Sequence, residues 1–332
     1  LAVAKRNIET FHQAQTTDAL VVETQPGLIC QRRTRPIQSV GLYIPGGTAP
    51  LVSTLLMTAI PAQIAGVPRI AICTPPGQNG VSPYILGAAY YLGLTEVYQV
   101  GGAQSIAALA LGTESIPAVD KIFGPGNSWV TTAKTFASQS VSGLSIDMPA
   151  GPSEVLVIAD DSANPEWLAL DVLSQAEHGE DSQSILLCTN EQLLKEAREK
   201  CYELAQSSSR WSYLKVSLEN TRWIYCDSLD QAMDISNAYA PEHLILNTEV
   251  PEGLAEKVLR AGSVFMGAYT PESLGDYASG TNHVLPTGGY AKSVSGLSLG
   301  SFQNSITFQA ASPKALQDIA PTVETLAKAE GL

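Results

Sequence analysis

The chain of 332 residues is 45% hydrophobic and 15% charged, and it carries a formal net charge of -13. This length suits two domains with separate cores, and the composition argues against an intrinsically disordered chain. The acidic balance, with no block rich in Lys and Arg, disfavours nucleic acids and anionic membrane surfaces, so the expected partners are small molecules.

Strand-like runs alternate with helical patterns in the first half of the chain. The runs are followed by glycine-containing turns and cover 40–44, 69–73, 96–100 and 121–123. This alternation predicts a parallel sheet, with residues 39–150 as one doubly wound, Rossmann-like domain. The apolar stretch 51–67 is interrupted by Pro61 and Gln63, so it predicts a buried helix pair or a kinked helix rather than a membrane span.

A second series of strand-like runs predicts a second Rossmann-like α/β domain over residues 151–297. The runs of this series cover 154–158, 184–188, 222–226, 243–246 and 263–266. After the first run, Asn164 and Pro165 predict the start of a helix that Gly179 ends. The terminal segments 1–38 and 298–332 are interpreted as small appendages, and the N-terminal one is expected to pack on the second domain.

The five cysteines predict a protein of the cytoplasm. They are odd in number, lack CxxC spacing and lie mostly in apolar runs, as reduced core residues do. Residues 1–6 do not resemble a signal peptide, and the lack of an initiator Met suggests that the chain begins inside a longer protein.

Three of the four histidines lie in short polar segments that also contain acidic residues. These segments are 174–179, 241–243 and 275–283. Because histidine can ligate a metal or carry a proton near neutral pH, this concentration predicts one polar pocket, and the chain is interpreted as an enzyme. The alternative is three unrelated histidines that local hydrogen bonds satisfy.

Two of these segments contain candidate metal ligands. Gln175 and His178 are three residues apart on the predicted helix, so they share a face and could hold one ion. Asp276 and His283 lie in a glycine-punctuated loop, where polar side chains can converge. Such oxygen and nitrogen donors suit zinc. The alternatives are a helix end capped by its own polar residues and an Asx-turn at Asp276.

Glu242 and His243, at the mouth of a predicted strand, form a credible general base and proton shuttle. Adjacent residues of a regular strand point to opposite faces, so both reach one site only if the chain bends there. Pro241 is expected to bias Ala240 toward an extended conformation. The alternative is a surface Glu beside a half-buried His.

The glycine turn 124–126 has the first two glycines of a dinucleotide-binding fingerprint, but Trp129 occupies the third position. An indole there is expected to block close packing of helix on strand. The turn still supplies backbone amides where pyrophosphate could lie. Gln104 and Asn127, each just after such a turn, can hydrogen-bond to ribose or amide groups.

Long motifs, in order over nearly the whole chain, resemble those of histidinol dehydrogenases. They are GLYIPGG (41–47), VGGAQSIA (100–107), KIFGPGN (121–127), IDMPAGPSE (146–154), SQAEH (174–178), PEHL (241–244) and GDYASGTNHVLP (275–286). The resemblance implies an aldehyde-dehydrogenase-like pair of Rossmann-like domains. It also implies a zinc-dependent, NAD-linked oxidation of L-histidinol to L-histidine through the aldehyde, in histidine biosynthesis.

The same resemblance implies roles for individual residues. Glu242 would activate the attacking water, and His243 would be the base. The implied zinc ligands are Gln175, His178 and Asp276. The implied substrate-binding residues are Ser153, Gln175, His178, His243, Asp276 and His283. The implied NAD contacts are Tyr43, Gln104 and Asn127.

The resemblance further implies a homodimer with shared active sites, in which a C-terminal segment gives the partner another His ligand and a Glu. The sequence stops at Leu332, before that segment is expected, so these residues alone are predicted to bind zinc with three protein ligands and to catalyse poorly. The alternatives are a catalytically impaired remnant that binds NAD or histidinol, a zinc hydrolase with Glu242 as base, and an aldehyde dehydrogenase relative with a Cys nucleophile.

Overall fold

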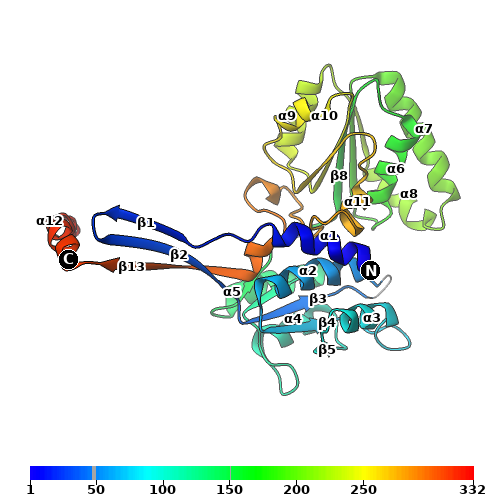
Figure 1. Ribbon diagram of the computed structural model, residues 1–332. Helices are drawn as coiled ribbons and strands as arrows, with labels where there is room; N and C mark the ends of the chain where they lie inside the picture. The colour runs from blue at the N-terminus through cyan, green and yellow to red at the C-terminus, as the bar shows by residue number, and fades with distance from the viewer. Residues whose placement is uncertain (47–49, 150) are drawn as a thin grey trace.

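The computed structural model describes residues 1–46, 50–149 and 151–332. They form two five-stranded parallel sheets, each covered by helices, and a three-stranded antiparallel arm that extends from one side (Figure 1). The predicted α/β class with two parallel sheets is therefore confirmed. Within these ranges, no helix combines the length and the apolar character that crossing a lipid bilayer requires.

The first sheet has the strand order β5-β4-β3-β6-β7. Its strands are β3 (Ser39–Tyr43), β4 (Arg69–Cys73), β5 (Val97–Tyr98), β6 (Lys121–Phe123) and β7 (Ser145–Ile146). Helices cover both of its faces, which explains why the strands are nearly continuous apolar runs. One face carries α2 (Val52–Ala65) and α3 (Pro83–Tyr91), and the other carries α4 (Gly102–Leu111) and α5 (Ser128–Ser140).

Most of the stretch 51–67 forms one helix, α2, that contains Pro61, so of the two expected forms the helix pair is wrong and the single helix remains. All side chains from Thr54 to Ala62 are buried, as in a helix that is apolar all round. The helix ends at Gly66, whose φ of 81° is left-handed.

The second sheet has the order β10-β9-β8-β11-β12. Its strands are β8 (Glu154–Ala159), β9 (Gln183–Cys188), β10 (Arg222–Tyr225), β11 (His243–Asn247) and β12 (Ser263–Met266). One face packs on α6 (Pro165–Ala176), α7 (Glu191–Ser207) and α8 (Trp211–Asn220), and the other on α9 (Leu229–Tyr239) and α10 (Pro251–Ala255). The short helix α11 (Glu272–Tyr277) contacts α6.

Helix α6 begins as predicted but ends early. The Asn164 side chain accepts from the N–H groups of Glu166 and Trp167, which caps the first turn. The helix was expected to continue to Gly179, yet its last residue is Ala176. Consequently Gln175 lies on the helix, and His178 lies in the turn that follows it.

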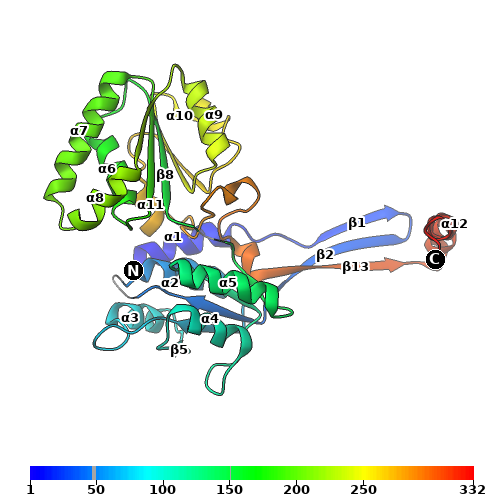
Figure 2. The ribbon, with the colours of Figure 1, turned by 180° about the vertical axis from the view of Figure 1, so that it is seen from behind.

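The arm consists of β1 (Leu20–Gln25), β2 (Leu28–Pro36) and β13 (Gln303–Ala311), in the order β1-β2-β13. Helix α12 (Pro313–Glu330) lies at its tip, far from both parallel sheets in the two views (Figures 1 and 2). The two terminal segments are thus joined to each other by antiparallel pairing.

The two sheet units are tied together by the N-terminal helix and by a returning segment. Helix α1 (Ala2–Gln13), expected on the second unit, contacts both: it packs along α2, and the Asn7 amide donates to the Ala278 carbonyl at 2.8 Å. The segment after the second unit returns to the first core, where Phe302 stacks on Phe123. This segment includes the 3-10 turns η1 (Tyr290–Lys292) and η2 (Leu299–Phe302).

Candidate active site

Several candidate residues meet where the carboxyl edge of the first sheet faces the amino edge of the second. A cleft of about 500 Å³ lies there, with Gly126 and Asn127 on one side and Ser153 and His178 on the other. A deeper cavity of about 100 Å³ shares the Gly126 and Ser153 walls. Glu242 and His283 are among the residues that line the deeper cavity. The predicted polar pocket is thus assembled from distant parts of the chain.

Glu242 and His243 reach the same site because the chain bends just before β11. Ala240 adopts a left-handed conformation, with φ of 62° and ψ of 67°, so the expectation that it is extended is wrong. Its N–H donates to the Ser236 carbonyl at 2.8 Å and closes the end of α9. A following proline favours an extended residue, so the left-handed turn at Ala240 goes against this local preference and is held by the surrounding structure. Glu242 therefore lies outside the regular strand, and His243 begins it.

The backbone of Glu154 holds both side chains of the pair. Its N–H donates to Glu242 Oε2 at 2.9 Å, and its carbonyl accepts from His243 Nδ1 at 3.0 Å. Because a carbonyl can only accept, Nδ1 carries a proton, and Nε2 is the ring atom available for chemistry. His243 Nε2 is buried, has no hydrogen-bond partner, and lies 3.5 Å from Asp276 Oδ1. This geometry suits a general base whose ring orientation is fixed by the hydrogen bond between Nδ1 and the Glu154 carbonyl.

Buried carboxyl groups around His243 set its charge. Burial raises the pKa of Glu242 to about 7 and that of Glu272 to about 8, because a carboxylate loses its hydration there. Burial by itself lowers the pKa of His243, but the charges of Glu242, Glu272 and Asp276 outweigh it and raise that pKa to about 10. For Asp276, burial opposes ionisation, yet the neighbouring His243 lowers its pKa below the usual value.

The three residues expected to ligate zinc present suitable atoms. Gln175 is 1% exposed, and its Oε1 is buried without a partner. His178 bonds through Nδ1 to the Ser174 carbonyl at 2.9 Å, which leaves Nε2 for a ligand, the usual arrangement for a metal-binding His. Asp276 was expected in a loop, but it lies in α11. An amide oxygen, an imidazole nitrogen and a carboxylate fit zinc.

Glu272 is a residue of this site that the sequence reasoning missed. It is 1% exposed, its Oε2 has no partner, and potential ligand atoms of His243, Glu272 and Asp276 lie within 4.8 Å of one another. The signal that could have found it is its spacing of four residues from Asp276, which places two carboxylates on one face of a helix.

His283 is half-buried and engaged at both ring nitrogens. Nδ1 lies 2.8 Å from the Asp276 carbonyl oxygen, and Nε2 lies 3.2 Å from Thr54 Oγ1 of α2. Burial lowers the pKa of this imidazole. A direct contact of His283 Nε2 with substrate therefore requires the Thr54 hydroxyl to turn away.

The residues expected to contact NAD lie at the carboxyl edge of the first sheet. The buried Tyr43 hydroxyl accepts from the Gly102 N–H at 3.4 Å, next to the exposed Gln104. Asn127 caps α5 by accepting from the Val130 N–H, and of the three expected NAD residues it alone is found lining the cleft within the described ranges.

The glycine turn before α5 also differs from expectation. Gly124 has a φ of 114°, and a Cβ there would lie 2.1 Å from the Tyr43 carbonyl oxygen, so only glycine fits. Trp129 does not block packing, because its side chain is 75% exposed and Val130 packs inward instead.

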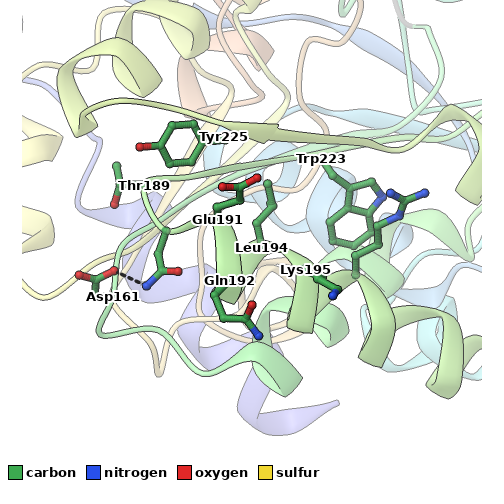
Figure 3. Close-up of a pocket in the computed structure, with 10 residues that line it drawn as sticks. Asp161, Thr189, Glu191, Gln192, Leu194, Lys195, Trp223 and Tyr225 are labelled. Atoms are coloured by element: carbon green, nitrogen blue, oxygen red, sulfur yellow. Dashed lines mark hydrogen bonds between the residues drawn. The ribbon is translucent and has the colours of Figure 1, made fainter.

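A larger depression of about 910 Å³ lies at the opposite end of the second sheet (Figure 3). Its walls include Asp161, Trp223 and Tyr225, and Asn190 donates to Asp161 at 2.7 Å. Neither a histidine nor any candidate catalytic residue is among its described lining. The cleft between the sheets, which is lined by candidate residues, is therefore the candidate active site.

A family model described as histidinol dehydrogenase matches residues 1–332. The histidinol dehydrogenase of Pectobacterium atrosepticum is 53% identical over 332 residues, which are 100% of this chain and 74% of that protein. The putative histidine biosynthesis bifunctional protein HisCD of Photorhabdus laumondii is 54% identical over 329 residues, which are 99% of this chain but 40% of that protein.

A solved histidinol dehydrogenase from Elizabethkingia anophelis has a TM-score of 0.97 at 51% identity, covering 100% of this chain and 76% of its own. An NAD-dependent aldehyde dehydrogenase from Sinorhizobium meliloti has a TM-score of 0.59 at 14% identity, covering 90% of this chain and 72% of its own. The second likeness concerns the fold alone, and it agrees with the architecture expected from the sequence. With the family model matching along its whole length, the chain belongs to the histidinol dehydrogenase family.

Proposed function

We propose that this chain catalyses the NAD-linked, zinc-dependent oxidation of L-histidinol to L-histidine through the aldehyde. The observation that carries the proposal is the buried Glu242–His243 pair, whose free His243 Nε2 faces Asp276. The pair lies beside the cleft that separates the two sheets. Membership of the family supplies the substrate and the reaction.

The protein's own residues divide the proton transfers between them. His243 Nε2 takes the proton of the alcohol, and later that of the hydrated aldehyde, while the Glu154 carbonyl holds the other ring nitrogen. Glu242 takes a proton from the attacking water through Oε1, because Oε2 accepts from the Glu154 N–H. Ser153 and His283, which line the deeper cavity, border the substrate.

Gln175, His178 and Asp276 would hold zinc, and Glu272 lies beside Asp276 as a further buried carboxyl. When bound, zinc supplies a Lewis acid that fixes the imidazole and amine of histidinol and has no redox role. A cation bound to Asp276 would neutralise one of the negative charges that raise the pKa of His243. The pKa of His243 would then fall, which favours the neutral imidazole that a general base requires.

NAD would lie along the carboxyl edge of the first sheet and accept hydride at each of the two oxidations. Tyr43, Gln104 and Asn127 would contact it there. The N-termini of α4 and α5 both lie at this edge, and Gly124 lets the backbone approach closely.

The cysteine-nucleophile alternative has little support in the described residues. Burial raises the pKa of Cys73 and of Cys201 to about 12, so neither is a thiolate near neutral pH. Cys30 lies on β2 of the arm. The zinc-hydrolase and impaired-remnant alternatives are separated from the proposal by the following experiment.

Formation of NADH from L-histidinol is expected to stop after chelation and to return when zinc is added back. The assay is run on the chain of 332 residues. Turnover that persists without zinc would contradict the proposal. Product formation without NAD would favour a hydrolase, and zinc binding without turnover would favour the impaired remnant.

The arm supports a homodimer as part of the same proposal. Apolar side chains of the arm and of α12 at its tip are open to solvent, with Val21 58%, Leu316 60% and Val323 55% exposed. A three-stranded sheet that stands apart from the body has little core of its own. A second copy of the chain is the partner that would cover these residues.

Sedimentation is expected to give the mass of two chains. Replacing both Leu316 and Val323, which lie seven residues apart on one face of α12, with Glu should weaken association by about a hundredfold, because charge would be buried. The matched control, Gln317→Glu with Thr325→Glu, adds the same charge at exposed polar positions of that helix. Equal association of both variants would contradict this interface.

A further inference from the structure

One hydrogen-bonded connection joins the first sheet unit to a proposed metal ligand of the second. Thr54, the third residue of α2, is 1% exposed, and its Oγ1 lies 3.2 Å from His283 Nε2. The opposite ring atom, Nδ1, lies 2.8 Å from the Asp276 carbonyl oxygen. The imidazole of His283 therefore bridges α2 and α11.

The direction of each hydrogen bond follows from the chemistry of the end groups. The Asp276 carbonyl can only accept, so His283 Nδ1 donates to it. In a neutral imidazole the other nitrogen is then an acceptor, so the Thr54 hydroxyl donates to Nε2. Among the described residues, the Thr54 hydroxyl makes no other hydrogen bond. The Thr54 hydroxyl thus favours the neutral tautomer of His283 that carries its proton on Nδ1, and this tautomer donates to the Asp276 carbonyl.

The Asp276 carbonyl needs such a donor because of its place in α11. It belongs to the last four residues of a six-residue helix, whose carbonyls have no partner within the helix. Holding this carbonyl fixes the backbone from which the Asp276 side chain projects. That side chain has Oδ1 3.5 Å from His243 Nε2, so its placement affects both the proposed ligand set and the base.

We infer that Thr54 is a positioning residue for the metal site: through His283 it holds Asp276 in the orientation that binds the ion and faces His243. This inference rests on the proposed zinc-dependent function. The first sheet unit contributes no proposed zinc ligand, but through Thr54 it would increase the affinity of the second unit for zinc.

The test compares zinc affinities of variants at Thr54 and at Thr58, one turn further along α2. Both threonines are buried, but the Thr58 hydroxyl donates to the Thr54 carbonyl at 2.7 Å, within the helix. Thr54→Val should lower zinc affinity about tenfold, as loss of an outer hydrogen-bond partner of a metal site does. Thr54→Ser should retain the affinity of the natural protein, and so should Thr58→Val, the matched control.

The dissociation constant of zinc is measured by competition with a chromophoric chelator, with folding checked by circular dichroism and thermal unfolding. If Thr54→Val does not fold, Thr54→Ala removes the same hydroxyl without adding bulk and should show the same loss. Equal zinc affinity of the folded Thr54 and Thr58 variants would overturn the inference, as would failure of Thr54→Ser to retain affinity. Absence of zinc binding by the unsubstituted protein would instead overturn the proposed zinc site itself.

Discussion

Replacing His243 with asparagine is expected to lower turnover of L-histidinol by about a hundredfold to ten-thousandfold, the usual contribution of a positioned base. The asparagine amide can still donate to the Glu154 carbonyl, so the substitution removes the basic nitrogen without removing the anchor. Both oxidation steps need the base, so both should slow together. The measurement is the rate of NADH formation from the alcohol and, separately, from the aldehyde.

A second buried histidine provides the control for this prediction. His12 is fully buried, and its Nδ1 bonds to the Ile8 carbonyl at 2.9 Å, but it lies in α1 outside the candidate catalytic residues. His12→Asn should cost stability and keep turnover per folded molecule. A His243→Asn variant that is folded and retains most of its activity in either step would exclude His243 as the base.

Replacing Glu242 with glutamine is expected to separate the two steps. The glutamine oxygen can still accept from the Glu154 N–H, but the amide cannot take a proton from water. Oxidation of the aldehyde should fall about a hundredfold to a thousandfold, while oxidation of the alcohol should change about threefold or less. Single-turnover NADH formation from each substrate measures the two rates.

The pH dependence gives an independent check on Glu242. Burial raises the pKa of its carboxyl to about 7, so the basic carboxylate form is lost as the pH falls through 7. The aldehyde step of the unsubstituted protein should slow over that range, and the residual rate of the glutamine variant should not show this loss. Equal slowing of both steps by Glu242→Gln would contradict the proposed division of roles.

Glu154→Gln is the matched control for this substitution. Glu154 is a buried neighbour whose Oε1 accepts from the Gly288 N–H at 3.0 Å, whereas its contacts to Glu242 and His243 come from its backbone. The same change from carboxylate to amide should leave the ratio of the two rates unaltered. A similar change of the ratio in both variants would mean that the effect arises from lost buried charge rather than from a lost base.

The sequence by itself determined the order of the elements and the chemistry of the candidate residues. Alternation of apolar runs with helical patterns predicted nine of the strands, because a parallel sheet covered on both faces requires such runs. The long motifs indicated the family, and the comparisons confirmed it. The proposed roles of Gln175, His178 and Asp276 stay predictions, although the structure gives each an atom that a metal could use.

Only the tertiary structure decided how these residues meet. A left-handed turn at Ala240, which local preference disfavours for a residue other than glycine, takes Glu242 out of the strand and beside His243. Thr54 carries no local signal of function, because it belongs to the site only through its contact with His283, far away in the sequence. Glu272 has only its spacing from Asp276 as a local signal, and its approach to His243 is a tertiary contact. Composition and periodicity report on neighbours along the chain, whereas the approach of side chains across two sheets depends on how the units pack.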